Sequence, residues 1–376
     1  MRFFDLQADA RTRSRQLSWA FALAVTGTVA GMNLALTLPW VLLHLLTGRF
    51  VDYPLGFMPV NIGVALMLVL GGWWLESGNC RHGVRLAEKL GARRAQPASR
   101  FDEQRLVNVV SEICIAAHMP APAVMVLPGH EGINAFATGD APGNWAITVT
   151  DGALQRLTRD ELQGLAAHEC SHLKEGDTAL NMRLIGMVAG LEMVWGFGRS
   201  LIPEWPDEDG DASADRWRRP QAAGPTPLGL PGLVFGSLIM AVGWLGWLAG
   251  HILQAAVSRE REYLADARAV QWTRQADGLG GTLRKILTQQ EMAPTGRRHA
   301  AGPSLARLAA HLFLTPDDGR WPSPEHPGRL GRLIATHPPL SERIRRIYGR
   351  PRGPLPLPQI DPRTGQPLPE QKPFRW

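Results

Sequence analysis

Three long stretches of the chain contain no Asp, Glu, Lys or Arg. They run from Trp19 to Gly48, from Pro54 to Leu75 and from Leu228 to Val257. A transmembrane helix needs about 20 consecutive apolar residues, so each stretch is long enough to cross a bilayer. Trp73 and Trp74 end the second stretch at the place of interfacial anchors. The alternative is a buried core helix, but runs of this length favour membrane-spanning helices.

A fourth hydrophobic segment, Leu184 to Ile202, is weaker. Glu192 lies near its middle and Arg199 near its end. A carboxyl group inside a bilayer is costly and usually faces protein or water. The segment therefore has two interpretations, a transmembrane helix or an amphipathic helix that lies against a domain. With it, the chain has about four transmembrane helices.

Basic residues lie on one side of the first two spans. They precede the first span and follow the second, namely Arg11, Arg13, Arg15, Arg81, Arg85, Lys89, Arg93 and Arg94. Basic flanks stay in the cytoplasm, so both ends of this hairpin are predicted to face it. The stretch 203–215 is rich in Asp and Glu and indicates an outside loop, although Arg216, Arg218 and Arg219 favour the opposite side.

Between the second and the third span, the pattern predicts a small α+β domain. Ser99 to Ala117 has the apolar spacing of an amphipathic helix. Three short β-like runs follow, at Ala123 to Leu127, Ile133 to Ala137 and Trp145 to Thr150, separated by Gly and Asp. A second helix comes after them, because Thr158 begins a T-x-x-E capping box.

This second helix carries the sequence His168-Glu169-Cys170-Ser171-His172, which fits the H-E-x-x-H motif. Residues four apart lie on one face of a helix, so both imidazoles can reach one zinc ion. Glu169 lies beside the first ligand and is placed to take a proton from a water molecule that the ion activates. The alternative is two histidines on a solvated helix face. The capped helix and its small residues favour the metal site.

A catalytic zinc ion needs a third protein ligand and one open position. The candidates lie just after the third uncharged run, in the segment Ser258 to Asp266. Glu262 and Asp266 are four residues apart and share a helical face, which suits a ligand and a carboxylate that orients a ligand histidine. By spacing alone, Glu260 is as good a ligand as Glu262.

At these residues the chain resembles the HtpX-type membrane metallopeptidases, gluzincins related to the CAAX prenyl proteases. Three stretches carry the resemblance. They are Asn134 to Gly139, similar to the edge-strand motif of that family, His168 to Asp177, similar to its zinc helix, and Arg261 to Asp266, similar to its third-ligand helix. The order of hydrophobic segments and motifs is similar as well.

The resemblance implies a zincin-like catalytic domain that binds one Zn2+ per chain. It implies that Glu262 is the third ligand and that Asp266 is the carboxylate behind a ligand. It also implies that Asn134, Ala135, Phe136 and Ala137 pair with an extended substrate by strand addition. Thr336 to Arg343 is similar to another motif of the family, in which His337 would stabilise the oxyanion. The alternative is that His337 caps the following helix.

One zinc site also constrains the topology. His168 precedes the two later hydrophobic segments and Glu262 follows them, so the chain between them crosses the membrane an even number of times.

The predicted organisation is a cytoplasmic N-terminus (1–17), a transmembrane hairpin (18–75), a first catalytic part with the zinc helix (76–183), a second hairpin (184–257) with an acidic outside loop (203–227), a second catalytic part (258–348) and a proline-rich tail (349–376) that is extended or disordered.

Charge and composition narrow the function further. Lys and Arg number 40 against 34 Asp and Glu, a net charge of +6, which suits an anionic membrane face. No nucleic-acid motif occurs, and a partner for the tail is possible. The sequence predicts a zinc endopeptidase of the inner membrane, with its catalytic domain in the cytoplasm, that hydrolyses membrane or misfolded proteins. The alternatives are a prenyl-protein processing protease and a zinc-stabilised scaffold without activity.

Overall fold

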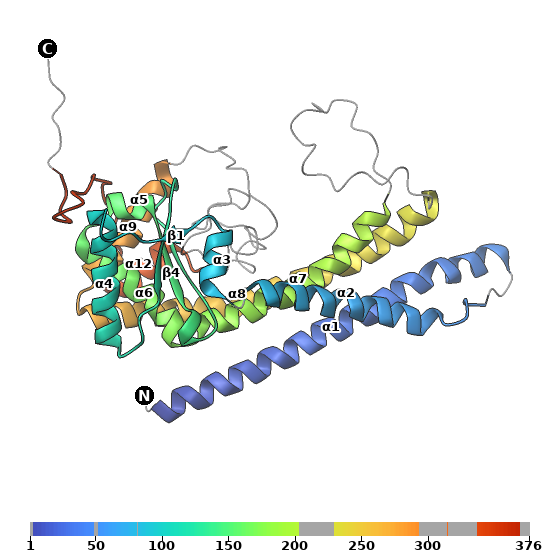
Figure 1. Ribbon diagram of the computed structural model, residues 1–376. Coiled ribbons are helices and arrows are strands. Elements are labelled where there is room, and N and C mark those ends of the chain that lie inside the picture. The colour runs from blue at the N-terminus through green and yellow to red at the C-terminus, as the bar shows by residue number, and fades with distance from the viewer. Residues whose placement is uncertain are drawn as a thin grey trace, which may run out of the picture. The chain divides into compact units, whose positions relative to one another are not determined.

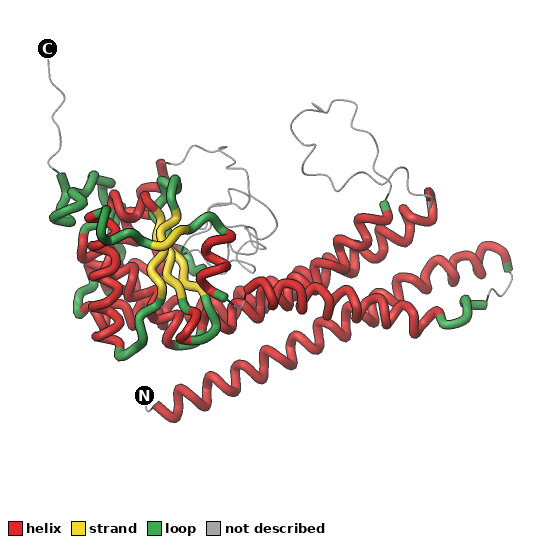
Figure 2. The backbone as a smooth tube through the Cα atoms, in the orientation of Figure 1, coloured by secondary structure: helices red, strands yellow, loops and turns green. Residues whose placement is uncertain are grey.

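The computed structural model describes residues 3–48, 52–80, 82–202, 229–292, 314 and 337–368. The chain forms two compact units, shown in Figure 1 and Figure 2. Unit 1 consists of Met1–Glu76 and Gly186–Leu253, and unit 2 of Ser77–Ile185 and Gln254–Trp376. The predicted acidic loop (203–227) lies outside the described residues.

Unit 1 is built from helices α1 (Phe3–Thr47), α2 (Phe57–Cys80), α7 (Asp177–Leu201) and α8 (Gly229–Thr273), of which α2, α7 and α8 also extend into unit 2. Among the described residues, three segments are long and apolar enough to cross a membrane. They are Trp19–Thr47, Phe57–Leu75 and Pro231–Thr273. These correspond to the three uncharged runs of the sequence. The weaker predicted segment, Leu184 to Ile202, lies mostly in α7, but α7 is not among these three candidate spans.

Close helix contacts through glycine hold unit 1 together. A Cβ atom at Gly198 of α7 would collide with the backbone of α8 at Met240, and one at Gly190 would collide with the backbone of α2 at Val69. Small residues that let helix backbones approach closely are typical of membrane bundles. A buried apolar cluster that includes Met32, Val69, Leu191 and Ile239 joins all four helices.

Unit 2 contains a four-stranded mixed sheet with the order β1-β2-β4-β3. The strands are β1 (Arg93–Arg94), β2 (Ala123–Leu127), β3 (Ala135–Thr138) and β4 (Ala146–Thr150). β2 and β4 are parallel, and the other pairs are antiparallel. The three strands predicted from β-like runs are present, with small shifts at their ends. The two-residue strand β1 was not predicted, because its basic pair has no strand pattern.

Helices cover both faces of this sheet. On one face, α4 (Phe101–Ala117) and α6 (Arg159–Lys174) pack on a large core, with α9 (Asp277–Met292) and α12 (Leu340–Tyr348) also contributing to it. On the other face, α3 (Gly83–Lys89) contributes to a smaller cluster around Phe136. The short helix α5 (Asp151–Arg156) follows β4. Alternate strand residues point to opposite faces, which explains the two clusters.

The capping box predicted for the second helix is present at the start of α6. The Thr158 side chain accepts the Glu161 N–H, and the Glu161 carboxylate accepts the Thr158 N–H at 2.8 Å. Gly176, with a φ of 75°, follows the end of the helix, where a left-handed residue ends many helices. The sequence thus fixes both ends of α6 and with them the position of its two histidines.

The proline-rich tail was predicted to be extended or disordered. Residues 351–359 form no helix or strand, and residues 361–366 form a turn in which Gly365 N–H donates to Asp361 O at 2.8 Å. Hydrogen bonds hold this tail to the rest of unit 2. Leu355 N–H donates to Arg284, Ile360 N–H donates to Gln155, and Arg159 N–H donates to Gly365. Three prolines supply no N–H within 354–358, yet the backbone of Leu355 bonds to α9 and Leu357 packs against the large core. Residues 369–376 lie outside the described part of the chain, and a partner for the tail stays a prediction.

Candidate metal centre

Three side chains from two helices converge on one point in unit 2. His168 and His172 extend from α6, and Glu262 extends from α8. The Nε2 atoms of the two histidines are 3.2 Å apart. Glu262 Oε2 lies 3.7 Å from His168 Nε2, and Glu262 Oε1 lies 3.6 Å from His172 Nε2. His168 and Glu262 are buried, and His172 is partly exposed.

These distances fit a zinc ion. With ligand atoms about 2.0–2.2 Å from a tetrahedral zinc ion, two ligand atoms lie about 3.3–3.6 Å apart. Two imidazole nitrogens and one carboxylate are also a ligand set of catalytic zinc sites, which leave one position open. Glu260, the alternative by spacing, is exposed, whereas Glu262 is 4% exposed and faces both histidines.

A carboxylate lies behind each histidine. His168 Nδ1 is 3.1 Å from Asp266 Oδ1, and His172 Nδ1 is 2.9 Å from Asp177 Oδ2. A carboxylate at this place fixes the tautomer and orientation of a ligand imidazole and makes it more basic. Burial lowers the pKa of His168 below its usual value, although the contact with Asp266 opposes this. His168 is thus kept neutral, the form that binds a metal.

Two arginines balance these buried carboxylates. Arg343 of α12 is fully buried and donates to Asp266 through Nε at 2.9 Å and Nη2 at 2.6 Å, and its Nη1 lies 2.9 Å from Glu262 Oε2. Arg261 forms an ion pair with Asp177. A buried charge is tolerated when it is paired and hydrogen-bonded. One guanidinium group, that of Arg343, therefore holds both Glu262, the third candidate ligand, and Asp266, the carboxylate behind His168.

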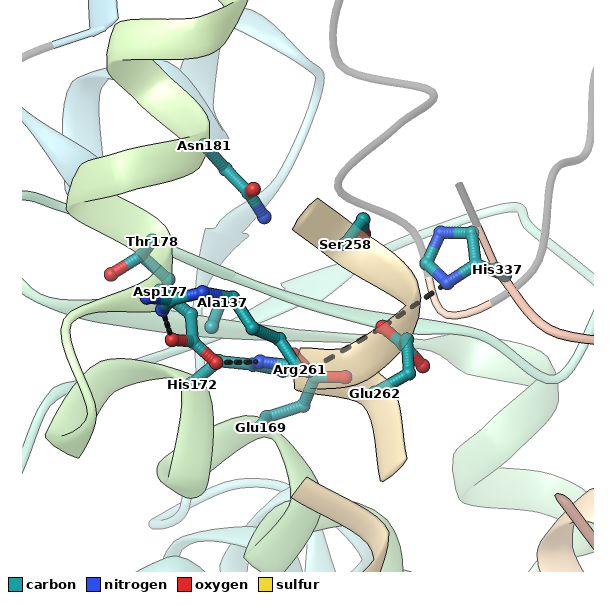
Figure 3. A pocket seen from close by; sticks show the side chains of 10 residues that line it. All are labelled: Ala137, Glu169, His172, Asp177, Thr178, Asn181, Ser258, Arg261, Glu262 and His337. Atoms are coloured by element: carbon teal, nitrogen blue, oxygen red, sulfur yellow. Dashed lines mark hydrogen bonds and ion pairs between the residues drawn. The ribbon is translucent and has the colours of Figure 1, made fainter. Parts of the chain in front are cut away.

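Glu169 lines a pocket that Figure 3 shows from close by. Its carboxylate is 2% exposed and accepts a hydrogen bond from the backbone of Ala137. Burial raises the pKa of Glu169 to about 7. A carboxyl group with this pKa exchanges a proton readily near neutral pH, as a general base requires.

Other predicted site residues reach the pocket to different degrees. His337 lines it and holds its Nδ1 3.1 Å from Glu262 Oε1. From the predicted substrate strand, Ala137 lines the pocket, while Asn134 accepts the N–H of Ala135 through its side chain at 3.0 Å. Phe136 is fully buried on the opposite face of the sheet.

Three charged residues of the centre, Asp177, Arg261 and Arg343, have no role that the sequence alone predicts. Asp177 and Arg261 line the pocket, and Arg343 is buried behind Glu262. Asp177 follows the glycine that ends the zinc helix, and Arg343 follows His337 in the motif near the C-terminus. All three lie in or at the end of stretches that resemble family motifs, but the spacing of a single charged residue does not indicate which group it contacts. A search for the partners that buried carboxylates require would have pointed to the two arginines.

Comparison with known proteins identifies the family. A model of Peptidase family M48 matches residues 101–350, which include every residue of the candidate centre. The chain belongs to peptidase family M48. It is therefore a metalloendopeptidase, and the resemblance to the HtpX-type members is confirmed by curated relatives.

Several relatives of the M48 family are similar to this chain over most of their length. A "Protease HtpX homolog" of Syntrophobacter fumaroxidans is 31% identical, covering 77% of this chain and 88% of the relative. One of Thermoanaerobacter pseudethanolicus is 34% identical over 67% of this chain and 74% of the relative. The crystal structure of S. mikatae Ste24p is 16% identical, covers 64% of this chain and 49% of that chain, and has a TM-score of 0.36. The M48 family implies a bound metal, typically zinc, a protein substrate and a membrane location.

Proposed function

We propose that this chain is a zinc-dependent endopeptidase of the cytoplasmic membrane that hydrolyses peptide bonds of membrane or misfolded proteins. The observation that carries the proposal is the convergence of His168, His172 and Glu262, whose ligand atoms lie within 4.8 Å of one another. The buried carboxyl group of Glu169 follows His168 in sequence and lines the same pocket as His172 and Glu262. A structural zinc site would use four protein ligands and would have no need of this base.

His168, His172 and Glu262 would hold the zinc ion, with Asp266 and Asp177 orienting the two imidazoles. A zinc ion in this position supplies Lewis acidity, which makes water acidic and polarises the scissile carbonyl. Glu169 accepts the proton of the attacking water as the new C–O bond forms. It then gives that proton to the nitrogen of the leaving amine as the C–N bond breaks.

His337 is placed to stabilise the negative oxygen that develops on the attacked carbonyl. It lines the same pocket as Glu169, and a preorganised N–H donor near the reacting carbonyl stabilises the charge that develops in the transition state. The substrate lies extended beside Asn134 to Ala137, along β3, which is the outer strand of the sheet. This arrangement suits unfolded or extended segments of many sequences, because backbone groups make most of the contacts.

The catalytic unit faces the cytoplasm and the chain spans the membrane four times. His172 and Glu262 approach to 3.6 Å, so the chain between them crosses the bilayer an even number of times. α8 contains one apolar segment of sufficient length, and α7 supplies the return crossing. The glycine contacts of α7 with α8 and α2 support this topology, because they pack α7 inside the bundle.

Metal removal and return test the proposal. The purified chain in detergent should cleave casein, should lose cleavage after treatment with a chelator and dialysis, and should regain it with one equivalent of Zn2+. Mg2+ should not restore cleavage, because it prefers oxygen ligands in octahedral geometry. Cleavage that persists in the zinc-free protein would rule out the proposed mechanism.

A further inference from the structure

The sheet of unit 2 ends at β3, so the outer edge of this strand is the place where an extended peptide can add. Thr150 N–H donates to Asn134 O at 3.1 Å, and the backbone of Asn134 therefore faces β4. Backbone groups of successive strand residues point to opposite edges. Ala135 consequently presents its N–H and its carbonyl to the outer edge.

Leu314 of the same chain occupies that edge. Its N–H donates to Ala135 O at 3.0 Å, the bond that an added strand would make. The Ala135 N–H bonds to the Asn134 side chain, and the Ala137 backbone bonds to Glu169. The carbonyl of Ala135 is thus an acceptor suited to a substrate, and it is engaged by Leu314.

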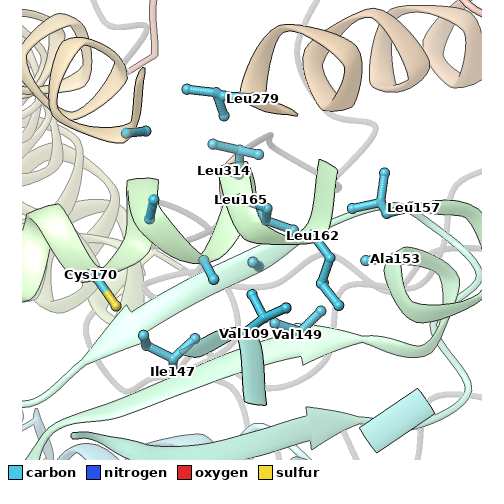
Figure 4. Packing of buried hydrophobic residues seen from close by; sticks show 14 of the residues in the cluster. Val109, Ile147, Val149, Ala153, Leu157, Leu162, Leu165, Cys170, Leu279 and Leu314 are labelled. Carbon is cyan, nitrogen blue, oxygen red and sulfur yellow. The ribbon is translucent and has the colours of Figure 1, made fainter. Parts of the chain in front are cut away.

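The side chain of Leu314 lies in an apolar site. Leu314 is 2% exposed and belongs to the same buried cluster as Ala135, Leu165 and Leu279. Figure 4 shows it beside Leu165 of α6 and Leu279 of α9. Leu314 therefore has two features of a residue in an added strand, namely a backbone bond to the edge and a side chain buried in a complementary site.

We propose that Leu314 is an internal pseudosubstrate, which holds the position on β3 that a substrate residue takes and marks an aliphatic subsite there. This inference rests on the proposed function. A substrate has to displace Leu314, and displacement leaves a leucine-sized cavity in the core. An aliphatic substrate side chain refills the cavity, whereas a polar side chain or glycine does not. Leu314 would thus have two effects. It would compete with substrate for the edge of β3, and its site would favour an aliphatic side chain at the substrate position that replaces it.

The kinetics of Leu314→Ala distinguish two roles of Leu314, competition with the substrate and packing of the core. The substrate is a quenched fluorescent casein-derived peptide that the wild type cleaves. If Leu314 competes with it, the variant should lower KM at least about threefold with kcat kept, because a larger fraction of the enzyme is open to substrate. Leu283→Ala is the matched control, since Leu283 is a fully buried leucine of the same cluster on α9. It should lower the melting temperature without lowering KM.

Hydrogen exchange tests the same proposal without changing Leu314. The Glu169→Gln variant is saturated with the same peptide, with binding followed by fluorescence anisotropy. Amide exchange at Leu314 should become faster as the peptide takes its bond to Ala135, while exchange in β3 becomes slower. Unchanged protection of Leu314 in the saturated protein would overturn the proposal.

The two proposals fail in different ways. If the wild type cleaves the peptide in a zinc-dependent reaction, but active Leu314→Ala has an unchanged or higher KM, this inference is wrong and the proposed function stands. If the wild type shows no zinc-dependent cleavage, the proposed function is wrong and this inference falls with it. Should Leu314→Ala fail to fold, the exchange experiment decides.

A leucine-to-asparagine scan of the peptide should also find one position where kcat/KM falls about tenfold or more.

Discussion

The guanidinium group of Arg343 lies 2.9 Å from the carboxylate of Glu262 and joins α12 to α8 at the centre of the candidate site. The same group makes two hydrogen bonds to Asp266. Arg343 is the counter-charge of two buried carboxylates, and its own pKa is raised because, despite burial, their negative charges favour its protonated form. The metal site therefore depends on a residue that binds no metal.

Arg343→Met should destabilise unit 2 strongly. It leaves two buried carboxylates without their cation, and breaking a buried pair from one side costs about 3–5 kcal/mol. Arg346→Met is the matched control on the same helix, because Arg346 is more than half exposed and pairs with Glu342 at the surface, where an ion pair contributes about 1 kcal/mol or less. Thermal unfolding in detergent compares the two. Equal melting temperatures would contradict the role of Arg343.

Glu262→Ala should lower the zinc content of the purified protein far more than Glu260→Ala. The first change removes a carboxylate that faces both histidines, and the second removes an exposed one. Zinc per chain is measured by mass spectrometry of the metal after dialysis. Equal zinc content in the two variants would show that Glu262 is not the third ligand.

Asp177→Asn should weaken zinc binding by about 10–100-fold, the usual effect of losing the carboxylate behind a ligand histidine. Asp177 holds His172 Nδ1 at 2.9 Å. Glu175→Gln is the control, because Glu175 lies two residues earlier and pairs with Arg268 instead. Competition with a fluorescent zinc chelator gives both affinities. If the two variants bind zinc equally well, Asp177 does not orient the ligand.

Labelling of single cysteines tests the membrane topology. Gly210→Cys and Gln290→Cys are made in a background without native cysteines and treated in intact cells with an impermeant maleimide. With four spans and a cytoplasmic catalytic unit, position 210 is labelled and position 290 is protected. Protection of both would mean that α7 and α8 do not form a crossing hairpin. Labelling at 290 would reverse the orientation.

Local signals in the sequence were sufficient for the elements that build the site. The spacing of His168 and His172 and the capping box at Thr158 define α6, because both depend on residues only three or four apart. The β-like runs predicted β2, β3 and β4 for the same reason. These elements position Glu169 and the two histidines, so the motif alone predicted much of the candidate centre.

The contacts between distant segments could not be predicted. Spacing left Glu262 and Glu260 equivalent, and only the resemblance to a family separated them. Arg343 reaches Glu262 from another helix, and Leu314 reaches Ala135 from a part of the chain with no strand pattern. Such pairs are fixed by tertiary packing and charge balance, which a local pattern does not contain. The described part of the tail is a similar case. Its proline-rich pattern did not predict the backbone hydrogen bonds of Leu355 and Ile360 to the rest of unit 2.

The central claim is that Glu169 is the base of a zinc peptidase, and Glu169→Gln tests it most directly. The amide keeps the size of the side chain and leaves His168, His172 and Glu262 in place, but it cannot accept the proton of the attacking water. Zinc content and casein cleavage are measured on the same purified samples of wild type and variant. The account predicts one zinc ion per chain in both proteins, with cleavage by the variant reduced at least about 100-fold. A variant that holds zinc and cleaves casein at the wild-type rate would contradict it.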